Sequence, residues 1–156
     1  MTGSEKRGAK LTADMHPFLE GFPEGFLAAA SENLRDRTFE TEEVVFQEGH
    51  RAEHFYLILN GKVALEIGAP DHPRITVQTV GTREVLGWAW LVPPYRWPVD
   101  ARAVKPTQAL ELDAFVLHRY FKLHPDIGYK FLLRLLPVIA GRLDETRMQL
   151  VDIHGV

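Results

Sequence analysis

The sequence predicts a mainly β domain with helices at both ends, and three observations support this. From Arg37 to Asp113 apolar residues recur with a period of two, in short runs separated by turn residues. The Asn60-Gly61 pair between two of these runs is the dipeptide most typical of a two-residue hairpin turn. Before and after this region the apolar residues follow the spacing of helices. Short strands at this spacing predict a small antiparallel sandwich, jelly roll or barrel.

Length and composition are those of one soluble domain. The chain has 156 residues, of which 46% are hydrophobic and 25% charged, so it can bury a core without disulfides. It has no cysteine, which excludes disulfides, cysteine nucleophiles and thiolate metal sites. The formal net charge of −3 argues against nucleic acid as the main partner. No secretory signal and no membrane-spanning apolar run are present, so we expect a cytoplasmic protein without a membrane partner.

Residues 1–14 lack an apolar pattern and are expected to form a disordered tail, which leaves residues 15–152 as the folded domain. Residues 15–36 are predicted to be helical in two pieces that begin at Pro17 and Pro23, since proline is favoured at the first position of a helix. Apolar residues at helical spacing are expected to pack in the core rather than hold a ligand: Phe18, Phe22, Phe26, Leu27, Ala30 and Leu34.

The region from residue 37 to 113 divides into short strands. We expect strands at residues 39, 44–46, 54–59, 62–67, 74–80, 85–86, 99–104 and 109–112. Asn60-Gly61 is predicted to join two of them as a type I′ hairpin. Residues 68–73, which include two prolines and a glycine, are expected to form a loop.

Residues 114–152 return to the helical pattern. A short helix, 114–123, is expected to begin after Asp113 as its N-cap and to end at His124-Pro125. A long helix, 126–152, should follow and kink at Pro137, which lacks a backbone donor.

This long helix has apolar residues on two sides. One flank comprises Phe131, Leu135 and Val138. The other is a coiled-coil-like seam formed by Leu132, Leu136, Ile139, Leu143, Thr146 and Leu150. Because a protruding apolar seam is unfavourable in water, we expect a homodimer through this helix, with packing of both flanks inside one chain as the alternative.

One segment, residues 87–103, resembles neither a surface loop nor an amphipathic strand. It holds all three tryptophans, Trp88, Trp90 and Trp97, with a Pro-Pro pair and two arginines. This composition is typical of a pocket or a contact surface. The tryptophans either line a pocket for a flat or hydrophobic ligand or fill it and leave a ligandless structural or protein-interaction module. If residues 87–91 are extended, Trp88 and Trp90 share one side.

The order of these elements resembles the cyclic-nucleotide-binding domain of the catabolite-activator and anaerobic-regulator (Crp/Fnr) superfamily. The resemblance covers residues 16–150 and rests on four motifs, which are His16-Pro17-Phe18-Leu19 with Phe22-Pro23-Glu24, Val45-Phe46-Gln47-Glu48-Gly49, the run 55–63 (FYLILNGKV), and Val85-Leu86-Gly87. It implies a double-stranded β-helix, a jelly-roll-like β-roll, between N-terminal helices and two C-terminal helices. It also implies a non-catalytic sensor or regulatory module whose ligand repositions the C-terminal helices.

The resemblance places a phosphate-binding cassette at residues 87–101, and here the sequence departs from the family pattern. Ligand-binding members have a Gly-Glu pair whose Glu contacts the ribose, where this chain has Gly87-Trp88. They have Pro-Arg-Ser/Thr-Ala, with the Arg on the cyclic phosphate, where this chain has the run 98–101, PVDA. Loss of that Arg removes a contact worth ~1.5–3 kcal/mol, and the new aspartate should repel an anion. Conventional binding of cAMP or cGMP is therefore not expected, and no other cofactor is indicated.

The candidate ligand-binding residues belong to this cassette: Gly87, Trp88, Ala89, Trp90, Arg96, Trp97, Val99, Asp100 and Ala101. Arg96 is the main candidate for an anion contact, with stacking on a neighbouring ring as the alternative. Arg102 is expected to pair with Asp100, two residues earlier on the same strand face. Arg83 stands where the family usually has a turn glycine, which predicts a left-handed backbone.

Catalysis, metal binding and DNA binding have less support. His50, Glu53 and His54 suggest a cupin-like metal enzyme, but histidines four residues apart share a face only in a helix. No phosphate loop, nucleophile elbow or paired-carboxylate site is present, so we expect neither enzyme nor metal site. Related regulators carry a helix-turn-helix after the long helix, whereas this sequence ends there. Arg134, Arg142 and Arg147 are interleaved with Asp144 and Glu145, which predicts a solvated face and not a DNA surface. No DNA-binding domain is therefore expected.

Overall fold

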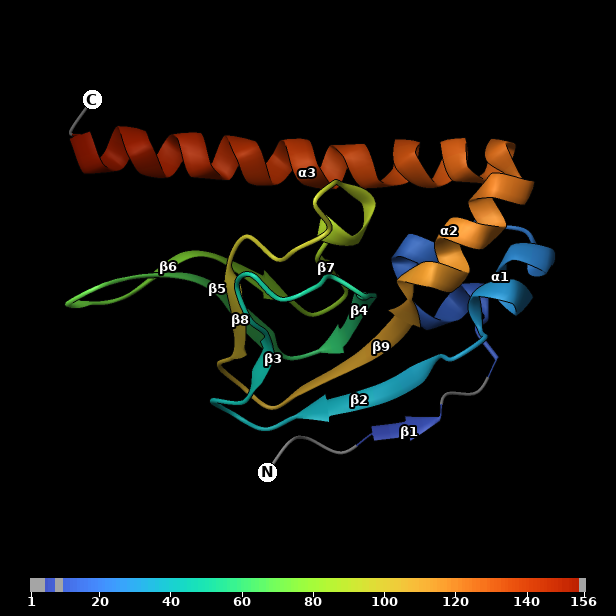
Figure 1. Cartoon of the computed structure of the whole chain (residues 1–156), viewed down its shortest axis with the longest axis horizontal. Helices are drawn as coiled ribbons and strands as arrows, with labels where there is room; N and C mark the ends of the chain where they lie inside the picture. The colour runs from blue at the N-terminus through green and yellow to red at the C-terminus, as the bar shows by residue number, and fades with distance from the viewer. Residues whose placement is uncertain (1–4, 8–9, 155–156) are drawn as a thin grey trace.

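The computed structural model describes residues 5–7 and 10–154, which form two antiparallel sheets with helices packed around them (Figure 1). The strands are β1 (Glu5–Arg7), β2 (Arg35–Phe39), β3 (Val44–Phe46), β4 (His54–Asn60), β5 (Lys62–Ala69), β6 (His72–Gly81), β7 (Val85–Leu86), β8 (Asp100–Ala103) and β9 (Thr107–Asp113). One sheet has the order β1-β2-β9-β4-β7 and the other β3-β8-β5-β6. The mainly β class with flanking helices is confirmed.

The helices also follow the sequence pattern. They are α1 (Glu24–Ala30), α2 (Ala114–Leu123) and α3 (Pro125–His154), with 3-10 turns η1 (Ala13–Met15), η2 (Pro17–Leu19) and η3 (Ala89–Leu91). Pro17 opens η2 as predicted, whereas Pro23 is the N-cap of α1 and precedes the helix by one residue. The Asp113 carboxylate accepts hydrogen bonds from the backbone N–H groups of Phe115 and Val116, which confirms it as the N-cap of α2.

Asn60-Gly61 does not form the predicted hairpin, because β4 and β5 lie in different sheets. The pair is instead a corner where the chain passes from one sheet to the other. Gly61 has a φ of +121°, and a Cβ there would lie 2.3 Å from Thr107 Oγ1 and 2.6 Å from Thr107 Cα. Glycine is therefore required by a close crossing over the start of β9, and not by a type I′ turn.

The hairpin next to it joins β5 and β6, and the prediction of a loop at residues 68–73 is wrong. The two strands stay paired as far as Ala69 and His72, and Asp71 at the turn has a φ of +64°. Pro73 lies within β6, an edge strand, where a missing backbone donor is tolerated. Figure 1 shows this hairpin extending away from the body of the β-roll.

Part of the segment predicted as a disordered tail is folded. Residues Glu5–Arg7 pair antiparallel with β2. Leu11 is buried in the core, and its backbone N–H donates to Ser31 Oγ at 2.8 Å. A single well-packed leucine thus anchors the chain before the first predicted helix. Residues 1–4 and 8–9 of the predicted tail lie outside the described residues.

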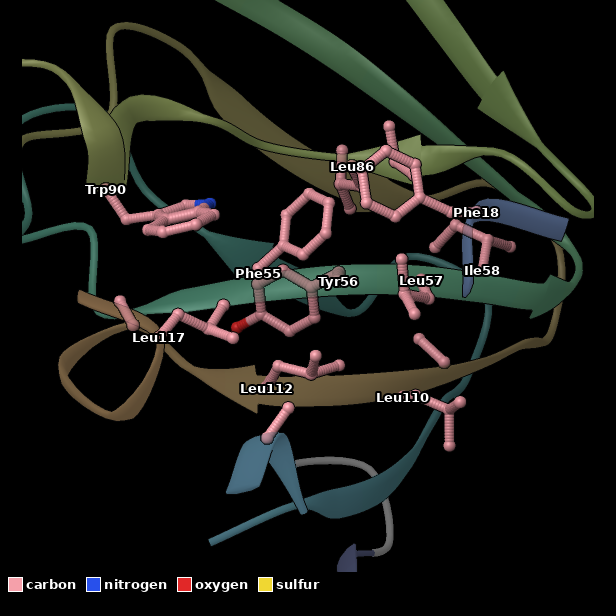
Figure 2. Packing of buried hydrophobic residues seen from close by; sticks show 14 of the residues in the cluster. Phe18, Phe55, Tyr56, Leu57, Ile58, Leu86, Trp90, Leu110, Leu112 and Leu117 are labelled. Atoms are coloured by element: carbon pink, nitrogen blue, oxygen red, sulfur yellow. The ribbon is translucent and has the colours of Figure 1, made fainter. Parts of the chain in front are cut away.

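The N-terminal phenylalanines pack in the core, as predicted. The ring of Phe18 lies 5.1 Å from that of Phe131 in α3 and 5.4 Å from that of Phe55 in β4. Phe22 and Phe26 extend the same cluster toward α2 and α3. Figure 2 shows Phe18 and Phe55 beside Leu57, Leu86 and Trp90. This aromatic core fixes the start of α3 against the β-roll.

Helix α3 runs the length of the molecule (Figure 1) and continues unbroken through Pro137. Its inner flank, with Phe131 and Leu135, is buried. The leucines of the predicted seam face the other way, and Leu132, Leu136, Leu143 and Leu150 are 46–55% exposed. The other two seam residues lie at the border with the β-roll, since Ile139 packs against the core and Thr146 accepts a hydrogen bond from Gln78 in β6. The two flanks thus have different surroundings, and the seam is uncovered in one chain. Among the described residues, no helix is both long and apolar enough to cross a bilayer.

Candidate functional site

A cavity of about 320 Å³ lies beside the cassette, between the β-roll and α3. Most of its walls are carbon, and its lining residues are Phe46, Leu65, Leu86, Gly87, Trp88, Ala89, Val92, Pro93, Pro94, Arg96, Trp97, Pro98, Val99 and Arg142. Two arginines and no acidic residue belong to this set. The arrangement suits a small, largely apolar ligand with a negative charge.

Six of the nine predicted site residues border this cavity: Gly87, Trp88, Ala89, Arg96, Trp97 and Val99. Trp90, Asp100 and Ala101 do not. Eight lining residues are not among those predicted: Phe46 from β3, Leu65 from β5, Arg142 from α3, and Leu86, Val92, Pro93, Pro94 and Pro98 from in or beside the cassette. The strand residues could have been found from the position of their strands in the β-roll. Nothing in the local sequence distinguishes Arg142 from the other arginines of α3.

Trp88 and Trp90 do not share a side, because residues 89–91 form the turn η3 instead of an extended strand. Trp90 is buried on the far side of the cassette, with its ring 5.4 Å from Phe55 (Figure 2). Its Nε1–H donates to the Gly87 carbonyl at 3.2 Å, and its own carbonyl lies 2.7 Å from His118 Nε2 in α2. Trp90 therefore anchors the cassette and does not line the cavity.

Trp97 forms one wall of the cavity. Its ring stacks on Phe46 with 3.8 Å between centroids and an interplanar angle of 8°. Gly87 has a φ of +85°, and a Cβ on it would lie 2.7 Å from the Trp97 ring. The glycine of the family motif therefore also makes room for a tryptophan here. Trp88 and Trp97 thus line the space without filling it.

Arg142 connects α3 with the cassette. The sequence predicts it on a solvated face, but its residue is only 7% exposed. Its Cζ lies 4.9 Å from the centre of the Trp88 ring, its Nη2 donates to the Val85 carbonyl, and its Nη1 has no partner. Burial lowers the pKa of the guanidinium below its usual value. A helix residue thus contributes a buried cation to the wall of the cavity.

The predicted pair between Arg102 and Asp100 is wrong. Arg102 makes a bidentate contact with Glu66, with the closer nitrogen and oxygen 2.6 Å apart, and a second ion pair with Glu42. Arg74 pairs with Asp100 instead. The register of β5 and β8 places Ala64 opposite Arg102 and Glu66 opposite Asp100, so Glu66 is the diagonal cross-strand neighbour of Arg102. Long side chains reach such a diagonal neighbour. The Arg102 hydrogen bonds hold the pKa of Glu66 below its usual range.

The Asp100 carboxylate is thus engaged away from the cavity, which it does not border. Its carboxylate also accepts a hydrogen bond from the Glu48 backbone N–H at 2.7 Å. With Arg74 as a counterion, its charge is compensated outside the cavity. The electrostatic objection to an anionic ligand is removed, although the cassette arginine of the family is still absent.

Arg96 borders the cavity but is exposed. Its Nη1 donates to the Gly49 carbonyl at 2.9 Å, and no ring of the described residues makes a cation–π contact with it. The alternative that Arg96 stacks on a neighbouring ring is therefore not supported, and its anion contact stays a prediction. Arg83 has a φ of +66°, which confirms the predicted left-handed backbone at the position of the turn glycine.

The histidines near residue 50 do not form a metal site in the described part of the chain. His54 Nε2 lies 3.7 Å from a carboxylate oxygen of Glu111. No cluster of three or more His, Asp or Glu side chains among the described residues could hold a metal ion. The described residues therefore give no structural support to a cupin-like metal enzyme.

Comparison with known proteins agrees with this architecture. Residues 36–124 match the family model described as cyclic nucleotide-binding domain. The chain is 26% identical over 134 residues to a CRP-like cAMP-activated global transcriptional regulator from Mycobacterium tuberculosis. That match covers 86% of this chain and 58% of the regulator, so the chain spans less than two thirds of its relative.

Solved structures show the same fold at lower identity. A cyclic nucleotide-binding domain from Methylobacillus flagellatus superposes with a TM-score of 0.72 at 21% identity, covering 84% of this chain and 74% of that one. The catabolite activator protein of Thermus thermophilus gives a TM-score of 0.66 at 24% identity, covering 88% and 63%. The β-roll with flanking helices is thus the family architecture. Since the family model covers more than half of the sequence, this chain belongs to the cyclic nucleotide-binding domain family.

Proposed function

We propose that this chain is a non-catalytic, cytoplasmic sensor module that binds a small ligand in the cassette cavity and transmits its presence through α3. The observation that supports this most is that one cavity is bordered by both the cassette and α3, through Arg142. Six predicted residues form the proposed binding wall: Gly87, Trp88, Ala89, Arg96, Trp97 and Val99.

The ligand we propose is not cAMP or cGMP held in the usual way. Trp88 and Val99 both border the cavity and occupy the positions where the resemblance implies a ribose-binding Glu and a phosphate-binding Arg. Neither side chain can accept from a ribose hydroxyl or pair with a phosphate. A cyclic nucleotide would lose two of its principal contacts.

The proposed signal passes through the contacts of Arg142. Its guanidinium contacts Val85 and Trp88. Its backbone carbonyl accepts a hydrogen bond from Gln78 Nε2 in β6 at 2.6 Å. A ligand that changes the position of this side chain therefore acts on α3 and on the β5–β6 hairpin together. Ligand binding then shifts the population of α3 positions, as the family resemblance implies.

We propose that α3 acts on a second copy of the chain. The seam residues Leu132, Leu136, Leu143 and Leu150 are about half exposed. The last three recur every seven residues, and the partly exposed Ile139 and Thr146 between them complete the four- and three-residue spacing of a coiled coil. A matching helix from a second copy would cover the seam and extend the fold as a homodimer.

A second candidate function is a ligandless interaction module. It is favoured by the exposed apolar rim of the cassette, where Val92 is 55% and Tyr95 44% exposed. In that case a protein partner covers the rim and the cavity stays empty.

A thermal-shift panel separates the two functions. A ligand at a hundred times its dissociation constant stabilises a protein by about 2.7 kcal/mol, which raises its melting temperature by several degrees. We expect a shift with small organic anions and none with cAMP or cGMP. If no small molecule in a broad metabolite set shifts the melting temperature, the sensor proposal is contradicted and the interaction module is favoured.

A further inference from the structure

We propose that the cavity binds a small aromatic carboxylate and that Arg142 holds the carboxylate group. This inference rests on the proposed sensor function and names the chemical class of its ligand. The observation behind it is an arginine that is buried at the cavity wall and only partly satisfied.

Arg142 lacks both a counterion and a full set of acceptors. No carboxylate of the described residues forms an ion pair with it, and its Nη1 donates to no described group. Within residues 5–7 and 10–154, its side chain has one acceptor, the neutral carbonyl of Val85. Buried charges are normally paired, and buried donors are nearly always hydrogen-bonded. A carboxylate would supply the missing acceptor and the missing charge in one contact.

Two acidic residues act on Arg142 through space but are engaged or exposed. Glu84 and Glu145 both raise its pKa electrostatically, against the larger lowering by burial. Glu84 uses a carboxylate oxygen to accept from the Gly81 backbone N–H at 2.6 Å, and Glu145 is exposed on α3. Arginine remains charged at neutral pH even when it is buried. The cation therefore stays available to a ligand.

The rest of the lining favours a flat apolar body. The rings of Trp88, Trp97 and Phe46 border the cavity together with aliphatic side chains and prolines, and no lining residue carries a hydroxyl, an amide or a carboxylate side chain. A ligand rich in hydroxyl groups would lose its hydrogen bonds to water without replacement. The volume of about 320 Å³ is at the lower end for ligand sites, which suits one or two rings.

Arg142 is a better anion partner than Arg96. The Arg96 side chain is exposed and already donates to the Gly49 carbonyl. Solvent and salt weaken the contact of an exposed charge far more than that of a buried one. We therefore assign Arg96 to the rim and the carboxylate contact to Arg142.

Isothermal titration calorimetry with matched ligands tests this assignment. The probes are phenylacetate and 2-naphthoate, each compared with its neutral amide, phenylacetamide and 2-naphthamide. We expect the carboxylates to bind the wild-type protein at least tenfold more tightly than the amides. Arg142→Gln should weaken carboxylate binding roughly 10- to 150-fold and abolish this preference. Arg147→Gln, an exposed arginine on the same helix, is the matched control and should leave both affinities unchanged.

Each result has a distinct meaning. Equal binding of acid and amide, or an unchanged preference in Arg142→Gln, would overturn the inference and leave the sensor function standing. If cyclic nucleotides bind and the aromatic carboxylates do not, the inference is also overturned and a sensor function remains. No binding of any probe, together with no thermal shift in the metabolite panel, would overturn both this inference and the proposed sensor function. If Arg142→Gln does not fold, Arg96→Gln decides the assignment, because it should keep the preference for acid over amide if Arg142 holds the carboxylate and lose it if Arg96 does.

Discussion

The Arg142 guanidinium lies 4.9 Å from the centre of the Trp88 ring, and this contact joins the C-terminal helix to the cassette. Trp88 stands where the family resemblance implies a ribose-binding glutamate. The residue that departs from the family pattern is thus also the one that carries the contact with α3. This pair is where ligand binding and helix position would be coupled.

A double-mutant cycle measures this coupling. We expect Trp88→Leu and Arg142→Gln to interact by about 0.5–2 kcal/mol in the free energy of unfolding, because a cation over a partly desolvated tryptophan contributes that much. Urea unfolding of the two single variants and the double variant gives the value. Arg119 and Phe115, an exposed pair at 5.7 Å on α2, serve as the control and should couple more weakly. Additive effects at Trp88 and Arg142 would show that the contact is incidental.

Gly87 and Gly49 have nearly the same φ, so their alanine variants distinguish the cost of backbone strain from the cost of a side-chain clash. Gly87 and Gly49 have φ values of +85° and +84°, but only at Gly87 does an added Cβ meet another residue, Trp97. Gly49→Ala should lower the free energy of unfolding by about 1–2 kcal/mol through backbone strain alone. Gly87→Ala should lower it by about 2–4 kcal/mol, because the Trp97 ring must also move. Denaturant unfolding that gives equal losses would refute a packing role for Gly87.

His16 should make the fold sensitive to mild acid. It is buried, its Nδ1 accepts from the Phe18 backbone N–H, and burial, the largest cause, lowers its pKa below 6.5. In the unfolded chain His16 takes up a proton near pH 6.5, whereas in the folded protein this protonation needs a lower pH. The free energy of unfolding therefore decreases as pH falls from 6.5 toward the lower folded pKa. The loss from this residue is at most about 1.4 kcal/mol per pH unit.

The control for this pH effect is His16→Asn, which keeps an acceptor for the Phe18 N–H but cannot titrate. Its stability relative to the wild type should improve as pH drops from 7 to 5.5. Parallel curves for the two proteins would mean that His16 does not contribute. Urea unfolding at several pH values distinguishes these outcomes.

If the α3 seam forms the dimer interface, one charged residue introduced there should disrupt the dimer. Leu136 is 55% exposed at the centre of the seam, and Leu136→Glu should convert the proposed dimer to a monomer. Phe115 is 70% exposed on α2, away from the seam, and Phe115→Glu should leave the dimer intact. Light scattering over a range of concentrations gives the mass of each protein. A wild-type monomer at the highest concentration would contradict the homodimer.

The general fold follows from the sequence because local patterns determine its elements. Asp113 caps α2 through backbone groups two and three residues away, so this cap is predictable from the local sequence. The left-handed backbone at Arg83 was instead predicted from the family resemblance. Asn60-Gly61 shows where prediction from the local sequence fails. Its glycine is required by contact with Thr107, which is remote in sequence, and no local signal distinguishes that need from a hairpin.

The site was less predictable for the same reason. The cassette itself was located, but the partners of its charges come from other strands and from α3. Arg102 has Glu66 available only once β5 and β8 are paired, and Arg142 meets Trp88 only once α3 lies across the roll. Charge pairing and burial at this site depend on tertiary contacts that a periodic pattern does not encode.

Hydrogen exchange in the presence of 2-naphthoate tests the sensor account most directly. The account predicts slower exchange in residues 87–99 and in the part of α3 around Arg142, with both effects reduced in Arg142→Gln and preserved in Arg147→Gln. Protection confined to the cassette, with α3 unchanged at saturating ligand, would contradict the claim that the cavity communicates with the helix.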